Sequence, residues 1–194
     1  GKPYTRISWK IDFDRFGIKN LTNDMISLMK RRVYDIAGVT DNKVNVYYND
    51  NKVNIKSFQD YIELYPSNTK KIYEKLSDRW ELGVSVSPND KFEQISFVNG
   101  ISTPNGGIHI DVITKLISSL VVKYIKKKHK KDVPEKYVKN YISVYLNCII
   151  ENPSFDSQAK ERLITPKSKF GSKPEINDKF IKNLCDGGGL SEKV

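Results

Sequence analysis

Two stretches of the sequence carry residue types that could bind phosphate groups. The first is YIKKKHKK, which continues a lysine run that begins at Lys123 and holds six lysines over residues 123–131. Lys126, Lys127 and Lys128 are consecutive and spread around a helix axis, so the run fits a helix end that leads into a basic loop. Cations there suit the helix dipole and can contact DNA phosphates without reading bases. The alternative is a tail of solvated lysines that only promotes solubility.

The second stretch is ENPSFDSQAKERL, residues 151–163. Its Asn-Pro pair follows an expected strand and forces a turn, so we expect Gln158 and Lys160 to protrude from a loop beyond the end of the sheet. A lysine ammonium suits a terminal phosphate, and a glutamine can donate a hydrogen bond beside it. Most surface lysines are merely solvated, so the residues by themselves indicate a basic domain with one candidate phosphate-binding lysine.

Several other kinds of site are not supported by the sequence. It contains neither a G-x-x-x-x-G-K-[ST] phosphate loop nor a G-x-G-x-x-G that follows a strand. His109 and His129 lack partners at metal-ligand spacing, so no metal site is predicted. We expect His109 to make a structural hydrogen bond and His129 to be solvated. Gly187–Gly189 fits a helix stop better than a phosphate cradle, and Cys148 and Cys185 cannot form a disulfide framework.

Length and composition indicate one folded, basic domain. The 194 residues suit one domain, with or without an extension, and are enough to bury a core. Lys and Arg number 33 against 23 acids, a formal charge of +10 that favours nucleic acid or phosphates as partners. The most apolar stretch, residues 140–150, is well short of the ~20 residues needed to cross a bilayer, so no membrane partner is expected. The chain begins Gly-Lys-Pro without Met, so we expect a piece of a longer protein, in a reducing compartment.

The first half of the chain is expected to alternate strands and helices. The expected elements are a strand over 4–13, a helix from Thr22 to Gly38, a hairpin over 44–55, a short helix over 57–65 and a loop or loose helix over 67–79. Thr22 is a plausible N-cap, and Gly38 offers a left-handed helix stop. Ser57 has the chemistry of the next N-cap.

The second half has clearer periodicity. WELGVSVSP and FEQISFVNG flank a turn at 88–91 and predict an antiparallel hairpin. A helix over 108–130, a half-buried strand over 138–150 and a last helix over 175–185 follow. The strand-helix-strand unit 92–150 predicts a parallel crossover, right-handed by default. The fold class is therefore α/β (α+β), with a small mixed sheet and helices on one face.

Two motifs in the correct order resemble those of a known family. ISFVNGISTPNGGIHIDVI is similar to the signature of eukaryotic-type (type IIA) DNA topoisomerases II, and ENPSFDSQAKERL resembles their segment that ends in Gln-Thr-Lys. Weaker agreement spans nearly the whole chain. The resemblance identifies residues 1–194 as the transducer domain, with 175–194 as a terminal helix leading to the following domain. It implies a fold like ribosomal protein S5 domain 2, whose β-α-β crossover is left-handed, and this replaces the right-handed default.

The same resemblance implies roles for individual residues. Gln158, Ala159 and Lys160 take the place of the Gln-Thr-Lys loop, which reaches into the ATP pocket of a preceding GHKL domain. Lys160 takes the catalytic place, in contact with the γ-phosphate. Ala159 replaces the usual Thr, so only a backbone contact remains there. The family's lysine loop, which contacts DNA, corresponds to the stretch Lys123–Lys128; the candidate DNA-binding residues are Lys123, Lys126, Lys127 and Lys128.

The implied function is to couple ATP binding and hydrolysis to closure of the DNA gate and to strand passage. The cofactor is ATP, with Mg²⁺ held by the GHKL domain; none is expected on this chain alone, which should neither bind nor hydrolyse ATP measurably. The implied partners are duplex DNA, bound without sequence preference, the GHKL domain of the same polypeptide, and a second copy in the full-length homodimer. The nucleus or another DNA-containing compartment is the expected location. The alternative is a stand-alone, sequence-nonspecific nucleic-acid-binding module of the same S5-like fold.

Overall fold

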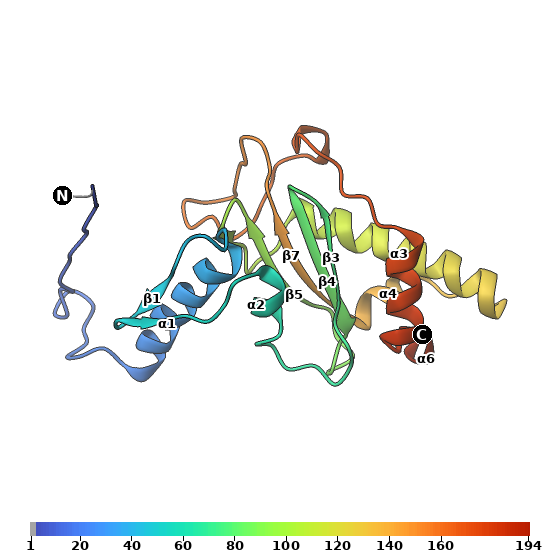
Figure 1. The fold of residues 1–194 in the computed structure, drawn as a ribbon, viewed down its shortest axis with the longest axis horizontal. Helices are drawn as coiled ribbons and strands as arrows, with labels where there is room; N and C mark the ends of the chain where they lie inside the picture. The colour runs from blue at the N-terminus through green and yellow to red at the C-terminus, as the bar shows by residue number, and fades with distance from the viewer. Residues whose placement is uncertain (1–2) are drawn as a thin grey trace.

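A five-stranded mixed sheet forms the centre of the computed structural model, which describes residues 3–194 (Figure 1). Its strand order is β3-β4-β7-β5-β6. The strands are β3 (Ile72–Ser77), β4 (Trp80–Val86), β5 (Glu93–Val98), β6 (Ile101–Ser102) and β7 (Ile142–Cys148). Only the β5–β7 pair is parallel among the pairs of this sheet in the described chain. The predicted α/β class with a small mixed sheet is confirmed.

Helices surround this sheet, and α3 is the longest of those described. The helices are α1 (Asn23–Val39), α2 (Phe58–Ile62), α3 (Ile108–His129), α4 (Glu135–Asn140), α5 (Asp178–Lys182) and α6 (Leu190–Lys193). A 3₁₀ turn covers Lys167–Lys169, a π turn covers Asn183–Gly187, and a small hairpin pairs β1 (Tyr47–Tyr48) with β2 (Asn51–Lys52). The α1 helix and the small hairpin lie at the N-terminal side of the sheet, and α5 and α6 lie at the other side (Figure 1).

The main core lies between α3 and one face of the sheet. Apolar residues recur along α3 every three or four positions, so they form one buried stripe. Ile113 and Ile117 of this stripe are completely buried, as are Val144 and Leu146 of β7. The α5 helix adds apolar side chains to the same cluster. α3 and α5 therefore lie on one face, whereas α2 covers the other face with α1 packed on it, so the prediction that the helices cover a single face was wrong.

A smaller core lies on the second face of the sheet. There Phe58, Tyr61 and Ile62 of α2 pack against Phe97 of β5 and Tyr145 of β7. Both faces of β7 are thus covered along much of its length. The prediction of a half-buried strand over 138–150 was wrong in two respects, because the strand is buried on both faces and α4 occupies its expected first residues.

The predicted hairpin of β4 and β5 was also wrong. β7 lies between them, antiparallel to β4 and parallel to β5. The connection through residues 87–92 therefore spans two strand spacings, about 10 Å, instead of closing a tight hairpin. The predicted β-α-β unit is confirmed, since β5 and β7 are parallel neighbours joined through α3. The left-handed sense of this crossover stays a prediction.

The N-terminal half contains further differences. Residues 4–13 have no strand partner within residues 3–194 and extend as an arm before α1 (Figure 1). An extended segment without a partner cannot form a ladder, so the predicted strand is absent. Residues 67–79, expected to be irregular, include β3. The last predicted helix, 175–185, is a shorter α5 followed by the π turn.

The helix starts are confirmed more closely than the helix ends. The backbone N–H of Met25 donates to Thr22 Oγ1 at 3.2 Å, and that of Asp60 donates to Ser57 Oγ at 3.0 Å. Gly38 is not the stop of α1, which continues to Val39. Within residues 3–194, no helix has the length and apolar content needed to cross a membrane.

Candidate functional site

The segment that holds the predicted phosphate-binding residues is a small hairpin over 154–164. Phe155 and Leu163 form an antiparallel bridge, and the Asp156 N–H donates to the Arg162 carbonyl at 3.1 Å. An Asn-Pro pair precedes the hairpin, as the sequence suggested. The hairpin therefore has a defined base and a short tip.

The tip carries the three residues singled out from the sequence. Gln158 and Ala159 are exposed, and Lys160 is half-buried. The Lys160 N–H donates to the Ser157 carbonyl at 3.1 Å, and Lys160 has a left-handed backbone with φ of +58°. Among residues 3–194, the Lys160 ammonium forms no ion pair. The structure thus leaves a cation at the tip available for an external anion.

The base of the hairpin is bound to the start of α3. The Leu163 N–H donates to the Gly106 carbonyl at 3.0 Å, and the Ile108 N–H donates to the Leu163 carbonyl at 3.1 Å. Gly107, between them, has φ of 130° and ψ of −165°, a combination open essentially to glycine alone. A Cβ at this position would lie 2.2 Å from the Leu163 oxygen. Glycine is therefore required where the hairpin meets the helix.

A second contact strengthens this junction. Asn105 donates through its backbone N–H to the Glu161 carbonyl at 3.1 Å and through Nδ2 to Glu161 Oε2 at 3.0 Å. Glu161 is the residue after Lys160, so its fixed backbone limits how far the tip can move relative to α3.

His109 has the structural role that the sequence predicted. Its Nε2 lies 3.1 Å from Thr103 Oγ1, and the side chain is completely buried. Burial lowers the pKa of His109 to about 4, because the charged imidazolium would lose its hydration. The ring is therefore neutral at physiological pH and supports the turn before α3. No cluster of three or more His, Cys, Asp or Glu side chains within the described residues could hold a metal.

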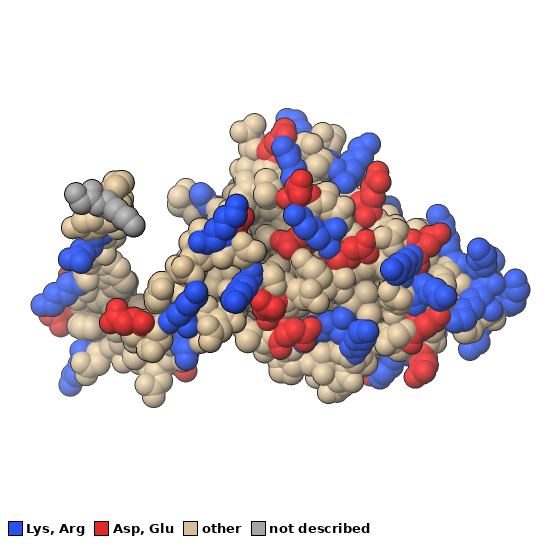
Figure 2. All heavy atoms as spheres, viewed as in Figure 1, with Lys and Arg blue, Asp and Glu red and all other residues tan. Residues whose placement is uncertain are grey.

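The predicted DNA-binding lysines lie at the opposite end of α3. Lys126 forms an ion pair with Asp132, and Lys128 forms one with Asp186, each at 2.8 Å. Lys123 and Lys127 lie one turn apart on the exposed side of the helix and form no ion pair among residues 3–194. Figure 2 shows basic side chains gathered at this end of the molecule, over the last turns of α3.

The lysine stretch is more ordered than the sequence suggested. Lys126, Lys127 and Lys128 all belong to the last turns of α3, and the helix ends only at Lys130, which has φ of 59°. Tyr124 Oη donates to Asp186 Oδ2 at 2.8 Å, so the same carboxylate contacts two side chains of α3. These contacts lower the pKa of Asp186 and join the helix end to the π turn.

The two cysteines have no chemical role in this site. Cys148 and Cys185 are both free and buried. Burial raises the pKa of Cys185 to about 11 and shifts that of Cys148 in the same direction, so both thiols stay protonated.

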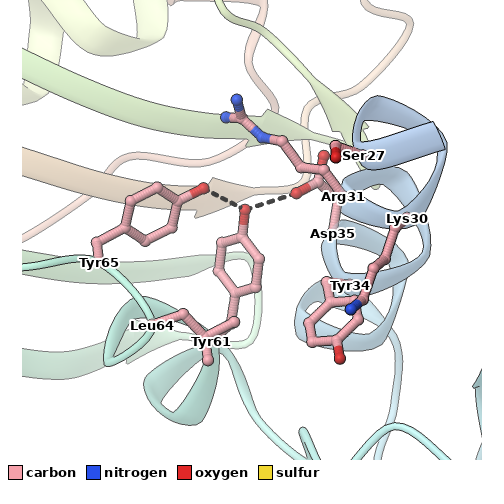
Figure 3. A pocket seen from close by; sticks show the side chains of 8 residues that line it. All are labelled: Ser27, Lys30, Arg31, Tyr34, Asp35, Tyr61, Leu64 and Tyr65. Atoms are coloured by element: carbon pink, nitrogen blue, oxygen red, sulfur yellow. Dashed lines mark hydrogen bonds between the residues drawn. The ribbon is translucent and has the colours of Figure 1, made fainter. Parts of the chain in front are cut away.

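Sequence reasoning missed a polar cluster between α1 and α2. Asp35, Tyr61 and Tyr65 are joined there by hydrogen bonds at the edge of a cavity of about 430 Å³ (Figure 3). Buried aspartates are uncommon without partners, but Asp35 sits in a helix rich in charged residues and nothing in the local pattern separates it from a solvated one. The SFQDYIELY segment, residues 57–65, gave only a helix-capping signal.

Comparison with known proteins identifies the family. The family model described as DNA gyrase B matches residues 40–194. The chain is 43% identical over 189 residues to the probable DNA topoisomerase 2 of Dictyostelium discoideum, covering 94% of the chain and 12% of that protein. It therefore spans about an eighth of this relative's length.

Two solved structures are similar over most of the chain. The ATPase region of Saccharomyces cerevisiae topoisomerase II aligns with a TM-score of 0.83 at 41% identity, over 94% of this chain and 47% of that one. The ATPase and transducer domains of DNA topoisomerase II from Balamuthia mandrillaris align with a TM-score of 0.81 at 37% identity, over 87% of this chain and 43% of that one. The fold is thus that of the topoisomerase II ATPase and transducer region. The chain belongs to the DNA gyrase B family, within the type II topoisomerases.

Proposed function

We propose that this chain is the transducer part of an ATP-dependent type II DNA topoisomerase, which couples the nucleotide state of an adjacent GHKL unit to DNA-gate closure and strand passage. The observation that carries the proposal is the hairpin tip, where Gln158 and Lys160 are held on a base fixed to α3 and Lys160 forms no ion pair with residues 3–194. The similar Balamuthia structure is described by its title as ATPase and transducer domains, which supports the assignment.

The boundary of this transducer is proposed to lie near residue 40, inside the range 1–194 expected from the sequence. The family model begins at that residue. Before it, Tyr4, Ile7 and Trp9 are 81%, 84% and 69% exposed. A run of large apolar side chains this exposed indicates a surface that another unit covers. We infer that the arm and α1 pack on the ATP-binding half of the ATPase region, and that 175–194 leads to the following domain.

The chemistry at the tip follows from charge and hydrogen bonding. Lys160 is a mobile point charge suited to a terminal phosphate, and a charge-assisted hydrogen bond to it contributes about 1.5–3 kcal/mol. Gln158 can donate beside it, and Ala159 supplies at most a backbone contact. Lys160 loses this contact when the γ-phosphate leaves, so the hairpin has a different interaction free energy with the two nucleotide states, as coupling requires. Mg²⁺ and the remaining ATP contacts belong to the GHKL unit.

The structure also supports a path from the tip to DNA. The α3 helix has 22 residues, a length of about 33 Å. Its first residues bind the hairpin base, and its last turns carry Lys123 and Lys127. A movement of the hairpin would therefore displace the basic end of the same helix. Contacts of these lysines with phosphates would be independent of DNA sequence.

The test is Lys160→Ala in the full-length enzyme. We expect ATP-driven strand passage to fall about tenfold, equivalent to about 1.4 kcal/mol, while DNA cleavage is unchanged. Lys167→Ala, at another exposed lysine near the hairpin, is the matched control and should behave like wild type. Rates of ATP hydrolysis and DNA relaxation that equal wild type in Lys160→Ala would refute the proposal.

A stand-alone nucleic-acid-binding module is the second candidate, favoured by the exposed basic end of α3 (Figure 2). It predicts that the DNA affinity of the full-length protein changes neither with ATP nor with the residue at position 160.

The topoisomerase proposal further includes a homodimer in the full-length enzyme and a nuclear or other DNA-containing location. By itself the chain should neither bind nor hydrolyse ATP, because two or three phosphate contacts barely offset ~4 kcal/mol or more of association entropy.

A further inference from the structure

A buried polar joint connects α1 to the rest of the molecule. Tyr61 Oη donates to Asp35 Oδ1 at 2.6 Å and lies 2.7 Å from Tyr65 Oη. Figure 3 shows the Tyr61 hydroxyl directed at the Asp35 carboxylate of α1, and the Tyr65 hydroxyl directed at that of Tyr61. Asp35 is 4% exposed and Tyr61 2% exposed. A hydrogen bond between buried polar groups is costly to lose, because the partner left behind is not rehydrated.

The two helices approach closely at this joint. A Cβ on Gly38 would lie 2.5 Å from Tyr61 Cγ. The Tyr61 ring therefore occupies the space that the side chain of any other residue at position 38 would need. The second carboxylate oxygen of Asp35 accepts from Arg32 Nη1 at 3.2 Å. Both oxygens of Asp35 therefore have donors, one from its own helix and one from α2. This fixes the rotation of α1 about its axis relative to Tyr61.

The tyrosines extend the joint to the sheet. The ring centroid of Tyr61 lies 5.6 Å from that of Phe97 in β5, in an edge-to-face arrangement. The ring centroid of Tyr65 lies 5.7 Å from that of Tyr145 in β7. β7 is the strand that leads to the hairpin with Lys160. The α1 carboxylate is thus connected to the strands that carry the nucleotide-sensing tip through two aromatic contacts.

The surroundings of the joint are open instead of tightly packed. The cavity beside it, about 430 Å³, is lined by Lys30 and Arg31 of α1 and by Leu64 and Tyr65 on the other side.

The apolar contacts of α1 lie near its C-terminal end, where Ala37 and Gly38 are buried and Val39 packs against the second core. Beside the cavity, α1 is joined to α2 by the hydrogen bond between Asp35 and Tyr61. The hydrogen bonds of Asp35, together with the short apolar contact at Gly38, then set the angle of α1. Burial raises the pKa of Tyr61 far above its ordinary value, so its hydroxyl remains a donor throughout the physiological range.

We propose that Asp35, Tyr61 and Tyr65 act as positioning residues for ATP-coupled strand passage, setting the angle between the ATP-binding unit and the transducer sheet. This inference rests on the proposed function, in which α1 moves with the ATP-binding unit and residues 40–194 form the transducer. No contact with nucleotide or DNA is required of these three side chains. Their effect is on how much of each ATP turnover becomes movement of the sheet.

The experiment compares Tyr61→Phe with Tyr73→Phe in the full-length enzyme. Tyr61→Phe keeps the ring and removes both hydroxyl contacts. Tyr73→Phe is the matched control, because Tyr73 Oη donates to Glu81 Oε1 at 2.6 Å between β3 and β4, away from α1. We expect the number of strand passages per ATP hydrolysed to fall about tenfold in Tyr61→Phe and to stay within twofold of wild type in Tyr73→Phe. Equal ratios in the two variants would overturn the proposal.

A pair of substitutions at position 35 gives an independent measurement if Tyr61→Phe does not fold. Asp35→Asn keeps an oxygen that can accept from Tyr61, whereas Asp35→Ala removes it. The number of strand passages per ATP should be near wild type in Asp35→Asn and reduced about tenfold in Asp35→Ala. An equal reduction in both variants would contradict the proposed positioning role of the Asp35–Tyr61 hydrogen bond.

Lys160→Ala, measured in parallel, separates the two proposals. Coupling that persists in Lys160→Ala defeats the proposed function itself. If coupling is lost in Lys160→Ala but retained in Tyr61→Phe, only the proposed positioning role of Asp35, Tyr61 and Tyr65 is refuted.

Discussion

Replacing Gly107 by Ala tests whether the hairpin is held on α3 by backbone packing. Gly107 has φ of 130° and ψ of −165°, and an added Cβ would lie 2.2 Å from the oxygen and 2.6 Å from the nitrogen of Leu163. Both of these atoms belong to backbone, so neither can rotate away as the end of a side chain could. The hairpin base must therefore move away from the helix start in Gly107→Ala.

The expected loss of stability has two parts. A non-glycine residue in this backbone region costs about 1–3 kcal/mol. Displacement of Leu163 also breaks the hydrogen bonds to Gly106 and from Ile108, at about 1 kcal/mol each. The sum is about 3–5 kcal/mol. For a domain of this size each kcal/mol lowers Tm by about 2–4 °C, so Tm should fall by about 10 °C.

Two other glycines provide graded controls. Gly106 has φ of +63°, but its nearest contact for an added Cβ is a Gln94 side-chain atom at 3.7 Å. Gly106→Ala therefore tests a left-handed backbone without a clash and should cost about 1 kcal/mol. Gly187 has no atom within 4 Å of an added Cβ and no positive φ. Gly187→Ala should change stability by less than about 0.5 kcal/mol.

The assay is urea unfolding of the three variants, with midpoints compared at a constant m-value. The expected order of destabilisation is Gly107→Ala, then Gly106→Ala, then Gly187→Ala. If Gly107→Ala costs no more than Gly106→Ala, the close approach of Leu163 does not hold the hairpin and the reasoning fails. In that case the position of Lys160 would depend on the Asn105–Glu161 contact alone.

Two further predictions concern charge. Replacing both Lys123 and Lys127 by Ala should reduce the steepness of log K against log[salt] for duplex DNA binding by about 1.8, which corresponds to two phosphate contacts. The control variant, Lys43→Ala with Lys52→Ala, should have the wild-type slope. If the Lys123/Lys127 variant also has the wild-type slope, these two lysines do not contact DNA. The pKa of His109 is about 4 in the folded chain, whereas its ordinary value is 6.5. Between these pH values the unfolded chain binds more protons than the folded chain. The free energy of unfolding should therefore fall by about 3 kcal/mol as the pH decreases from 6.5 to 4. His109→Gln, followed by urea unfolding across this range, should remove that part of the pH dependence.

The features predicted well from the sequence depend on neighbouring residues in the chain. The N-caps Thr22 and Ser57 act on N–H groups three residues away. The buried stripe of α3 repeats within each turn, so its periodicity is visible without knowledge of the fold. The exposed tip at Gln158 follows in the same way from the Asn-Pro turn before it.

The features that were missed depend on residues far apart in the sequence. The alternation of apolar and polar residues along β7 is typical of a strand with one solvent-exposed face. Only the contact of Tyr145 with α2 shows that its second face is covered. The position of β7 between β4 and β5 likewise depends on pairing between strands that are far apart in the sequence. The Asn105–Glu161 contact spans 56 residues and the Asp35–Tyr61 contact spans 26. Each side chain in these pairs has an ordinary surface explanation until its partner is known.

The way α3 is held determines where a movement of the tip can be absorbed. Its first residues bind the hairpin base, and its last turns are joined to the π turn through Asp186. Between these ends Ile113 and Ile117 are completely buried against the sheet. Sliding the helix would leave cavities that cost about 2–5 kcal/mol for each large side chain lost. A single phosphate contact of about 1.5–3 kcal/mol cannot supply this.

On the proposed function, the hairpin, α3 and the sheet must therefore move together when Lys160 gains or loses a phosphate partner. Under the same proposal, the relative movement then falls on the contact between α1 and this body, which consists of hydrogen bonds beside a cavity and a short apolar contact at the end of α1. A change of angle there costs the rearrangement of one or two hydrogen bonds, which is within the free energy that a phosphate contact provides. We therefore expect the α1–α2 joint, and not the core under α3, to be the place where the two proposed nucleotide states differ.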